Sequence, residues 1–207
     1  MLMKPAKKAR IAVFVSGGGT NLEALLKTQE QGNIPDGEIV LVLASKADVY
    51  ALTRAKNHGV PGFAVPRKEM DQAAFETALT EKLTEYQVDF IILAGFLSIL
   101  SSEFVQKWPE RILNIHPSLI PSFCGKGYYG LKVHEAALAR GVKVTGATVH
   151  FVNEIPDGGR ILLQKAVEIL PDDTPEVLQR RVMEQAEWVL LPQAAEIVSH
   201  QIALEKE

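Results

Sequence analysis

The chain has 207 residues, of which 47% are hydrophobic and 23% charged, and its formal net charge is -3. We expect one domain over residues 1–207, with a flexible tail at residues 1–9, because this length can bury a sizeable core. The slight acidic excess argues against a nucleic-acid-binding protein. No apolar run is long enough to cross a bilayer, and a single cysteine, Cys124, fits a reducing compartment. We therefore expect a cytoplasmic protein without nucleic-acid or membrane partners.

Short apolar runs alternate with amphipathic stretches in the first 140 residues. Strands are predicted near residues 11–15, 39–44, 62–65 and 90–94, with helices between them. The run at 90–94 is continuously apolar, as expected for a central parallel strand that is buried on both faces. The alternation predicts an α/β fold with a doubly wound, mostly parallel sheet and a nucleotide-binding-like N-terminal half.

A glycine-rich segment follows the first predicted strand. Ser16 precedes three glycines at 17–19, and Thr20 is then predicted to cap a helix through a capping box with Glu23. Backbone N–H groups at a helix start attract anions, so a phosphate is a natural ligand. The spacing matches neither the dinucleotide fingerprint nor the P-loop. A plain tight turn remains the alternative.

The predicted strand at 112–116 ends in two polar side chains. Side chains alternate along a strand, so Asn114 and His116 are expected on the same face. Pro117 cannot continue the strand, which places His116 at its carboxyl end. Ligands bind at the carboxyl ends of strands in open parallel sheets. Taken alone, such a histidine is more often a surface or core residue than a catalyst, and such an asparagine is more often a turn former.

A second polar group follows downstream. The predicted strand at 143–152 carries His150, and Asp157 comes next in a loop. Residues 161–169 are predicted to form an antiparallel strand at the sheet edge. An amide, an imidazole and a carboxylate are groups suited to acyl-type chemistry on a carbonyl carbon.

Two further segments complete the chain. Residues 121–129 form a loop rich in glycine and aromatic residues, which is typical of a lid or rim. Cys124 within it is expected to pack and not to act as a nucleophile. Thr174, followed by Pro175 at the first helical position, predicts the start of a long amphipathic helix.

Several of these segments resemble the folate-dependent formyltransferases, from about residue 10 to about residue 195. The segments are Ser16-Gly17-Gly18-Gly19-Thr20-Asn21-Leu22, Leu93-Ala94-Gly95-Phe96-Leu97, Asn114-Ile115-His116-Pro117-Ser118-Leu119, His150-Phe151-Val152 and Asp157-Gly158-Gly159. The resemblance implies an enzyme of purine biosynthesis that moves the formyl group of 10-formyltetrahydrofolate to the amine of glycinamide ribonucleotide. It implies small-molecule substrates and no metal.

The resemblance also implies roles for single residues. Asn114 and a protonated His116 would donate hydrogen bonds to an oxyanion, while Asp157, supported by His150, would keep His116 charged and move protons. The positions implied for the amine substrate are Gly19, Thr20, Asn21 and Glu187. The positions implied for the folate are Leu97, Ser98, Ile99, Leu100, Asn114, Ile155 and Asp157.

Three positions depart from the family pattern. Ser98 stands where many relatives have arginine, and Arg160 stands where proline is common. The segment before Pro192 is one residue longer than usual. Counting back from Pro192 makes Glu187 the match for the glutamate that contacts the ribose in relatives.

Four alternatives stay open. A formyltetrahydrofolate hydrolase would carry an extra N-terminal domain. A methionyl-tRNA formyltransferase would carry an extra C-terminal domain and a basic surface. We expect neither extra domain and no basic surface here. A metal hydrolase could use His116, His150 and Asp157 as ligands, although their spacing is not tight. A nucleotide-binding module without activity is the fourth. The oligomeric state is left open.

Overall fold

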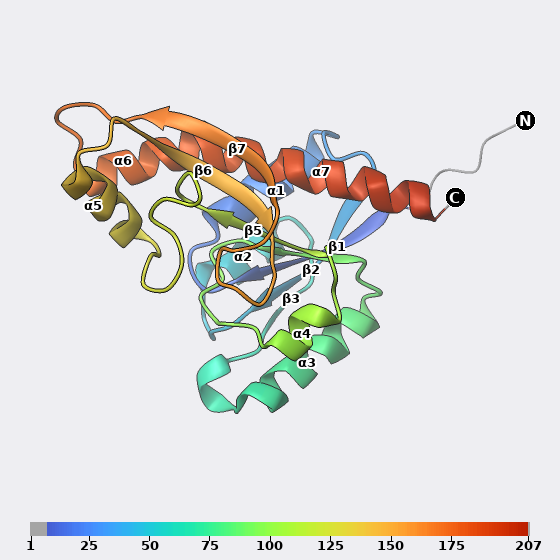
Figure 1. The fold of residues 1–207 in the computed structure, drawn as a ribbon. Coiled ribbons are helices and arrows are strands. Elements are labelled where there is room, and N and C mark those ends of the chain that lie inside the picture. Colours follow the sequence, from blue (N-terminus) through green and yellow to red (C-terminus); the bar gives the residue numbers. More distant parts are fainter. Residues whose placement is uncertain (1–7, 207) are drawn as a thin grey trace, which may run out of the picture.

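The structure is a computed structural model that describes residues 8–206 and consists of a sheet between two layers of helices (Figure 1). Most of the expected tail lies outside the described residues. Its last residue, Ala9, is fully buried in the first strand, so that part of the prediction was wrong. Across residues 8–206, no helix combines the length and the apolar character that crossing a membrane requires.

The elements follow the predicted alternation. The strands are β1 (Ala9–Val15), β2 (Gly37–Ala44), β3 (Gly62–Ala64), β4 (Phe90–Leu93), β5 (Ile112–His116), β6 (Val144–Phe151) and β7 (Ile161–Glu168). The helices are α1 (Thr20–Glu30), α2 (Tyr50–Asn57), η1 (Arg67–Glu69), α3 (Gln72–Glu85), α4 (Ser102–Gln106), α5 (Leu131–Arg140), α6 (Pro175–Val182), η2 (Met183–Glu187) and α7 (Trp188–Glu205).

The strand order in the sheet is β3-β2-β1-β4-β5-β6-β7. Strands β1 to β5 are parallel, and β6 runs antiparallel to both of its neighbours, β5 and β7. The predicted doubly wound sheet with antiparallel pairing at its edge is therefore confirmed. The chain leaves β1 toward β2 on one side and leaves β4 toward β5 on the other, so the gap between β1 and β4 is a topological switch point.

Each face of the sheet packs against its own set of helices. Val13 and Val15 join the apolar cluster that contains residues of α1, α2 and α7, whereas Ala12 and Phe14 join the cluster of α3 and α4. Figure 1 shows α7 on one side of the sheet and α3 with α4 on the other. The strand β4 supplies both clusters, which explains why its sequence is apolar at every position.

The predicted C-terminal helix begins as expected, since the Thr174 hydroxyl accepts a hydrogen bond from the Val177 N–H. It is interrupted at η2, a π-helical turn between α6 and α7. A π-turn accommodates one residue more than an α-turn. The segment in which the sequence has an additional residue therefore coincides with the π-turn.

Gly146 lets β6 and β7 approach closely, because a Cβ atom at this position would lie 2.0 Å from the Lys165 carbonyl oxygen. We expect Gly146→Ala to lower the free energy of unfolding by about 1–3 kcal/mol, the usual cost of overpacking. Urea denaturation measures this change. In the control Gly18→Ala, the added methyl group meets nothing within 4 Å, and the change should stay within about 0.5 kcal/mol. Equal losses in both variants would contradict the assigned clash.

Candidate active site

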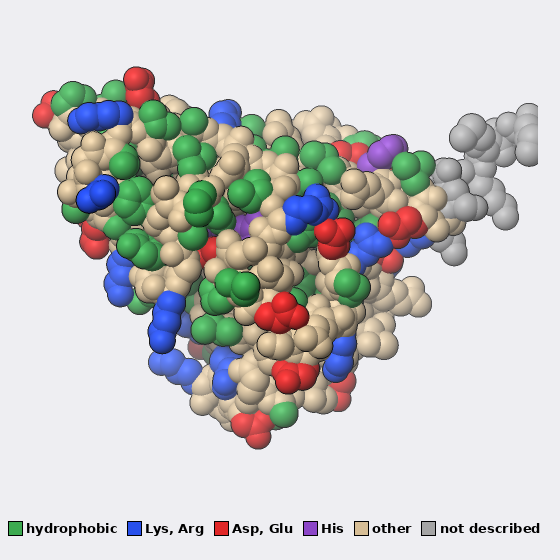
Figure 2. Space-filling model, viewed as in Figure 1, with side chains coloured by type: hydrophobic (Ala, Val, Ile, Leu, Met, Phe, Trp, Pro, Cys, Tyr) green, Lys and Arg blue, Asp and Glu red, His purple; other side chains and the backbone are tan. Residues whose placement is uncertain are grey.

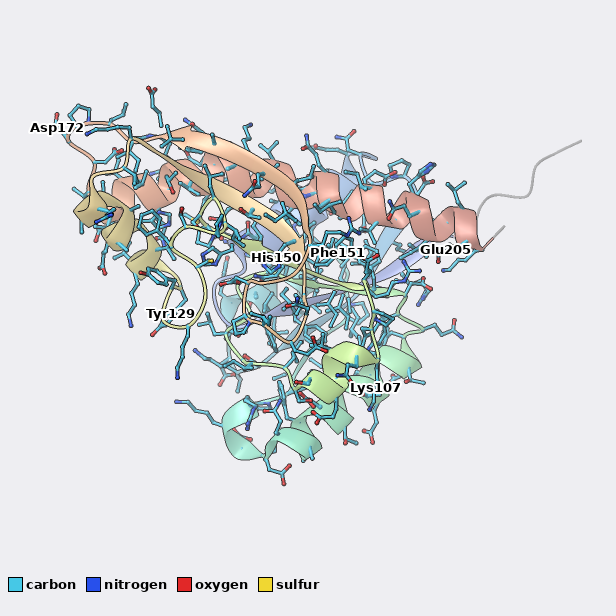
Figure 3. The ribbon with its side chains drawn as sticks, viewed as in Figure 1. Lys107, Tyr129, His150, Phe151, Asp172 and Glu205 are labelled. Carbon is cyan, nitrogen blue, oxygen red and sulfur yellow. The ribbon has the colours of Figure 1, made fainter. Side chains whose placement is uncertain are left out.

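The pairing of β5 with β6 brings the predicted polar residues together. In the antiparallel register, Asn114 lies opposite His150 and His116 lies opposite Thr148. Residues directly opposite each other share a face of the sheet, so all four side chains lie on one face. Both histidines are buried, at 4% exposure for His116 and 1% for His150. Figure 3 shows His150 near the centre of the molecule.

His150 orients the Asn114 amide. Its Nδ1 lies 2.8 Å from the Phe151 carbonyl oxygen, which only accepts, so Nδ1 carries a hydrogen and donates it. Its Nε2 lies 3.1 Å from Asn114 Nδ2 and accepts a hydrogen bond from it. The distance from Nε2 to Asp157 Oδ1 is longer, at 3.6 Å. His150, implied as a support for Asp157, therefore acts most directly on Asn114.

Asp157 lies in the loop between β6 and β7 and faces both other polar residues. Its Oδ2 accepts a hydrogen bond from the Gly125 N–H at 2.8 Å and lies 3.6 Å from His116 Nδ1. Its Oδ1 is 3.5 Å from Asn114 Nδ2. Burial opposes ionisation, but the hydrogen bond from the Gly125 N–H and the nearby His116 imidazole outweigh it, so the pKa of Asp157 is lowered. The carboxylate is therefore charged at neutral pH.

The backbone shape of this loop depends on small residues. Asp157 adopts φ 55°, in the left-handed region that aspartate tolerates better than most residues. A Cβ atom on Gly159 would lie 1.7 Å from the Phe151 carbonyl oxygen, so only glycine allows the chain to return this closely to β6.

The loop at 121–129 contacts the site through its backbone, as expected for a rim. His116 Nε2 donates to the Phe123 carbonyl oxygen at 2.8 Å, and the Gly125 N–H donates to Asp157. Sequence reasoning did not identify these two groups, because every residue carries them; the glycine-rich composition of the loop was the available signal. Figure 3 shows Tyr129, the last residue of this loop, to the side of His150.

Two other titratable side chains near this loop are kept uncharged. Burial, followed by the charge of Asp157, raises the pKa of the Cys124 thiol, which agrees with a packing role. Burial, followed by the charge of His116, lowers the pKa of His134 to about 4. His134 is fully buried on α5, so it is a packed residue.

The positions implied for the folate differ in exposure. Leu97 and Ile99 are 58% and 78% exposed, whereas Leu100 packs against the cluster of α3 and α4 and Ser98 is half-buried. Ile155, on the Asp157 loop, is 65% exposed. Figure 2 shows hydrophobic side chains on the surface around the loop that joins β6 to β7. Exposed apolar side chains beside polar groups are typical of a ligand-binding surface.

The glycine-rich segment enters α1 differently from the prediction. The cap is Gly19, at φ 75° in the left-handed region, and Thr20 is the first helical residue without a side-chain cap bond. The predicted capping box was therefore wrong, because the glycine backbone makes the turn. Glu23 instead pairs with Arg54 at 2.8 Å, which lowers the pKa of Glu23 to about 2. A Cβ atom on Gly19 would lie 2.7 Å from Ala51 Cβ, so the segment packs tightly on α2.

Asn21 and Glu187 meet at the start of α1. Asn21 Nδ2 donates to Glu187 Oε2 at 2.7 Å, although the two residues are 166 positions apart. The turn η2 directs Glu187 into this buried position, where it is 7% exposed. Burial raises the pKa of Glu187, and the bond from Asn21 offsets only part of this effect. The structure thus joins two of the residues implied for the amine substrate.

The two groups of candidate residues remain separate. Within residues 8–206, no side-chain hydrogen bond links Asn21 or Glu187 to Asn114, His116 or Asp157. Over the same residues, no group of three or more His, Cys, Asp or Glu side chains is arranged to hold a metal ion.

Glu187→Gln should show how the buried carboxyl affects stability. Because the folded-state pKa of Glu187 is raised, its contribution to stability is present below the unfolded pKa of ~4.3 and is lost as pH rises through the folded pKa. Glutamine does not titrate. The unfolding free energy of the variant relative to the unmodified protein should therefore increase from about pH 4 to pH 7, as measured by urea denaturation.

The matched control is Glu184→Gln, an exposed residue on the same turn that pairs with Arg180. Surface ion pairs contribute little, so this variant should follow the unmodified protein at every pH. A difference for Glu187→Gln that does not change with pH would contradict the proposed effect of burial.

Comparisons with known proteins identify relatives of this chain. Residues 9–194 match the formyl transferase family. The chloroplastic phosphoribosylglycinamide formyltransferase of Arabidopsis thaliana is 42% identical over 86% of this chain and 62% of its own length. The phosphoribosylglycinamide formyltransferase of Haemophilus influenzae is 41% identical over 88% of this chain and 84% of its own length.

A solved structure shows the same fold. Glycinamide ribonucleotide transformylase 1 from Symbiobacterium toebii superposes with a TM-score of 0.88 at 39% identity, covering 97% of this chain and 92% of that chain. The chain spans less than two thirds of the Arabidopsis relative but most of the other two proteins. These matches extend over nearly all of its residues, so the chain belongs to the formyl transferase family, in its phosphoribosylglycinamide formyltransferase branch.

Proposed function

We propose that this protein transfers the formyl group of 10-formyltetrahydrofolate to the amine of glycinamide ribonucleotide, giving formylglycinamide ribonucleotide and tetrahydrofolate. The observation that carries the proposal is the convergence of the Asn114, His116 and Asp157 side chains at the end of β5, with Asp157 reaching it from the loop after β6. Membership of the phosphoribosylglycinamide formyltransferase branch supports the choice of substrates. We expect the chain to act as one domain on these small molecules in the cytoplasm.

The reaction makes one carbon–nitrogen bond and breaks another. The substrate amine attacks the formyl carbon, and the carbonyl oxygen becomes an oxyanion. The bond from carbon to the folate N10 then breaks as the C=O double bond re-forms. The proton lost by the amine moves to N10, so charge and atoms balance. Groups that stabilise the oxyanion lower the barrier because its charge develops only during the reaction.

His116 and Asn114 are the proposed oxyanion donors. His116 Nε2 donates to Phe123 in the observed conformation, so a formyl oxygen would have to replace this carbonyl, with a shift of the loop. The contact from Asn114 to Asp157 is long, at 3.5 Å. The Asn114 hydrogen that faces Asp157 is therefore only weakly engaged and is available to the oxyanion, while the bond to His150 holds the amide in place.

Asp157 is the proposed proton carrier. Its lowered pKa keeps it ionised, so it can stabilise a charged His116 at 3.6 Å. It can also accept the amine proton, directly or through a water molecule, and pass it to the folate nitrogen. The two functions require the same carboxylate to face both His116 and the reacting atoms.

The substrates are proposed to bind on either side of these groups. The phosphate and glycinamide end of the amine substrate would bind at the start of α1, held by Gly19, Thr20 and Asn21, because a helix N-terminus favours anions. The ribose would contact Glu187, which bonds to Asn21. The folate would lie against the β4 loop and the Asp157 loop. The folate positions are Leu97, Ser98, Ile99, Leu100, Asn114, Ile155 and Asp157. Ser98 offers a hydroxyl in place of a cation for the folate tail.

His116→Ala should reduce turnover by about a hundred- to thousandfold, the usual cost of losing one oxyanion donor. Asp157→Asn should reduce it by a similar factor, which lies within the usual contribution of general acid–base catalysis. Steady-state kinetics with both substrates measure the loss, and circular dichroism checks the fold. His200→Ala is the control, because His200 lies exposed on α7 and pairs with Asp36. Near-normal turnover in either site variant would remove the proposed roles.

Consumption of 10-formyltetrahydrofolate should require glycinamide ribonucleotide. The assay follows tetrahydrofolate and formylglycinamide ribonucleotide with purified protein, in the presence and absence of the amine. We expect one formylated product for each tetrahydrofolate released. Release of formate without the amine would instead identify a hydrolase built on the same fold, and no release under either condition would contradict the proposal.

A further inference from the structure

The switch point between β1 and β4 holds a hydrogen-bonded link between the two proposed substrate loops. Ser16 directly follows β1 and precedes the glycine-rich segment, while Gly95 and Leu97 lie in the loop after β4. These loops leave the sheet side by side, because β1 and β4 are adjacent parallel strands. This is the place where open α/β sheets bind their ligands.

Ser16 bonds to the β4 loop through its backbone and through its side chain. Its N–H donates to the Gly95 carbonyl oxygen at 3.1 Å, and its Oγ accepts from the Leu97 N–H at 2.9 Å. The same Oγ lies 2.6 Å from Ser45 Oγ at the end of β2. Ser16 and Ser45 are 4% and 3% exposed, so both hydroxyls are shielded from water.

The side-chain bond matters because packing holds the flanks of this loop segment and not its tip. Phe96 and Leu100 pack against the cluster of α3 and α4, and the Ile99 carbonyl oxygen accepts a hydrogen bond from Gln72. The Leu97 side chain is largely exposed, so neighbouring side chains do little to fix its position. The bond from the Leu97 N–H to Ser16 is therefore a main restraint on the direction in which Leu97 points. Without the Ser16 hydroxyl, the Leu97 N–H would have to find another acceptor, so the loop would lose this restraint on its position.

We infer that Ser16 is a positioning residue that holds the folate-binding loop in place against the amine-substrate loop, and thereby sets the affinity for folate. The inference rests on the proposed function. Ser16 acts through Leu97 and needs no contact with either substrate. Its effect should fall on folate binding, because the hydroxyl bonds to the β4 loop and not to the glycines that follow.

Two alanine variants separate this role from a general structural one. Ser16→Ala removes the acceptor for the Leu97 N–H and also the contact with Ser45. Ser45→Ala removes an equally buried hydroxyl and the same hydroxyl pair, yet leaves the bond from Leu97 to Ser16 intact. Any loss due only to a buried hydroxyl should therefore be shared by the two variants.

Steady-state kinetics and calorimetry with tetrahydrofolate test the inference. In Ser16→Ala, we expect the KM for 10-formyltetrahydrofolate and the Kd for tetrahydrofolate to rise about tenfold, which corresponds to about 1.4 kcal/mol. The KM for glycinamide ribonucleotide should stay within about twofold, and Ser45→Ala should stay within about threefold for both substrates.

Three outcomes would overturn the inference: an unchanged folate Kd in Ser16→Ala, an equal rise in Ser45→Ala, or an equal rise in KM for both substrates. If Ser16→Ala does not fold, Ser16→Cys replaces it. Sulfur is a weaker acceptor of similar position, so the folate Kd should rise by a smaller factor, and an unchanged value would again overturn the inference. Unmodified protein that binds no folate and transfers no formyl group would overturn the proposed function itself.

Discussion

The antiparallel register between β5 and β6 is the constraint on which the site depends. It places Asn114 opposite His150, so one imidazole orients the amide that faces Asp157. Because side chains alternate along a strand, a slip of one residue would turn His150 to the opposite face. The reversal of β6 relative to the five parallel strands is therefore what adds the second histidine and the aspartate loop to the end of β5.

The buried polar groups stabilise one another only as a set. Asp157 loses solvation on burial, and its charge is retained because the Gly125 N–H and the His116 imidazole compensate for that loss. His116 lies at the end of β5, and Gly125 lies in the loop at 121–129. A site of this kind depends on loop position as much as on the sheet. The loop must also move if the Phe123 carbonyl is to release His116 Nε2 to a substrate.

The remaining candidate residues are placed by unusual backbone geometry. Gly19 turns the chain into α1 with a left-handed conformation, and the π-turn η2 directs Glu187 toward Asn21. At the switch point, Ser16 joins the loop after β4 to the segment that leads into α1. Ser16 thus connects the loop proposed to bind folate with the segment proposed to bind the amine substrate. Within residues 8–206, no side-chain hydrogen bond links Asn21 or Glu187 to Asn114, His116 or Asp157.

Local sequence patterns were enough to predict the α/β alternation, the buried central strand and the common face of Asn114 and His116. These features follow from local periodicity, which depends only on neighbouring residues. The motifs also indicated the family and its candidate residues. Three features became visible only in the folded chain: His150 orients Asn114, Gly19 caps α1, and Phe123 and Gly125 use their backbone at the site. The bond between the Ser16 hydroxyl and the Leu97 N–H likewise became visible only in the folded chain. Such contacts join groups far apart in the chain, or use backbone atoms that all residues share, so no local pattern identifies them.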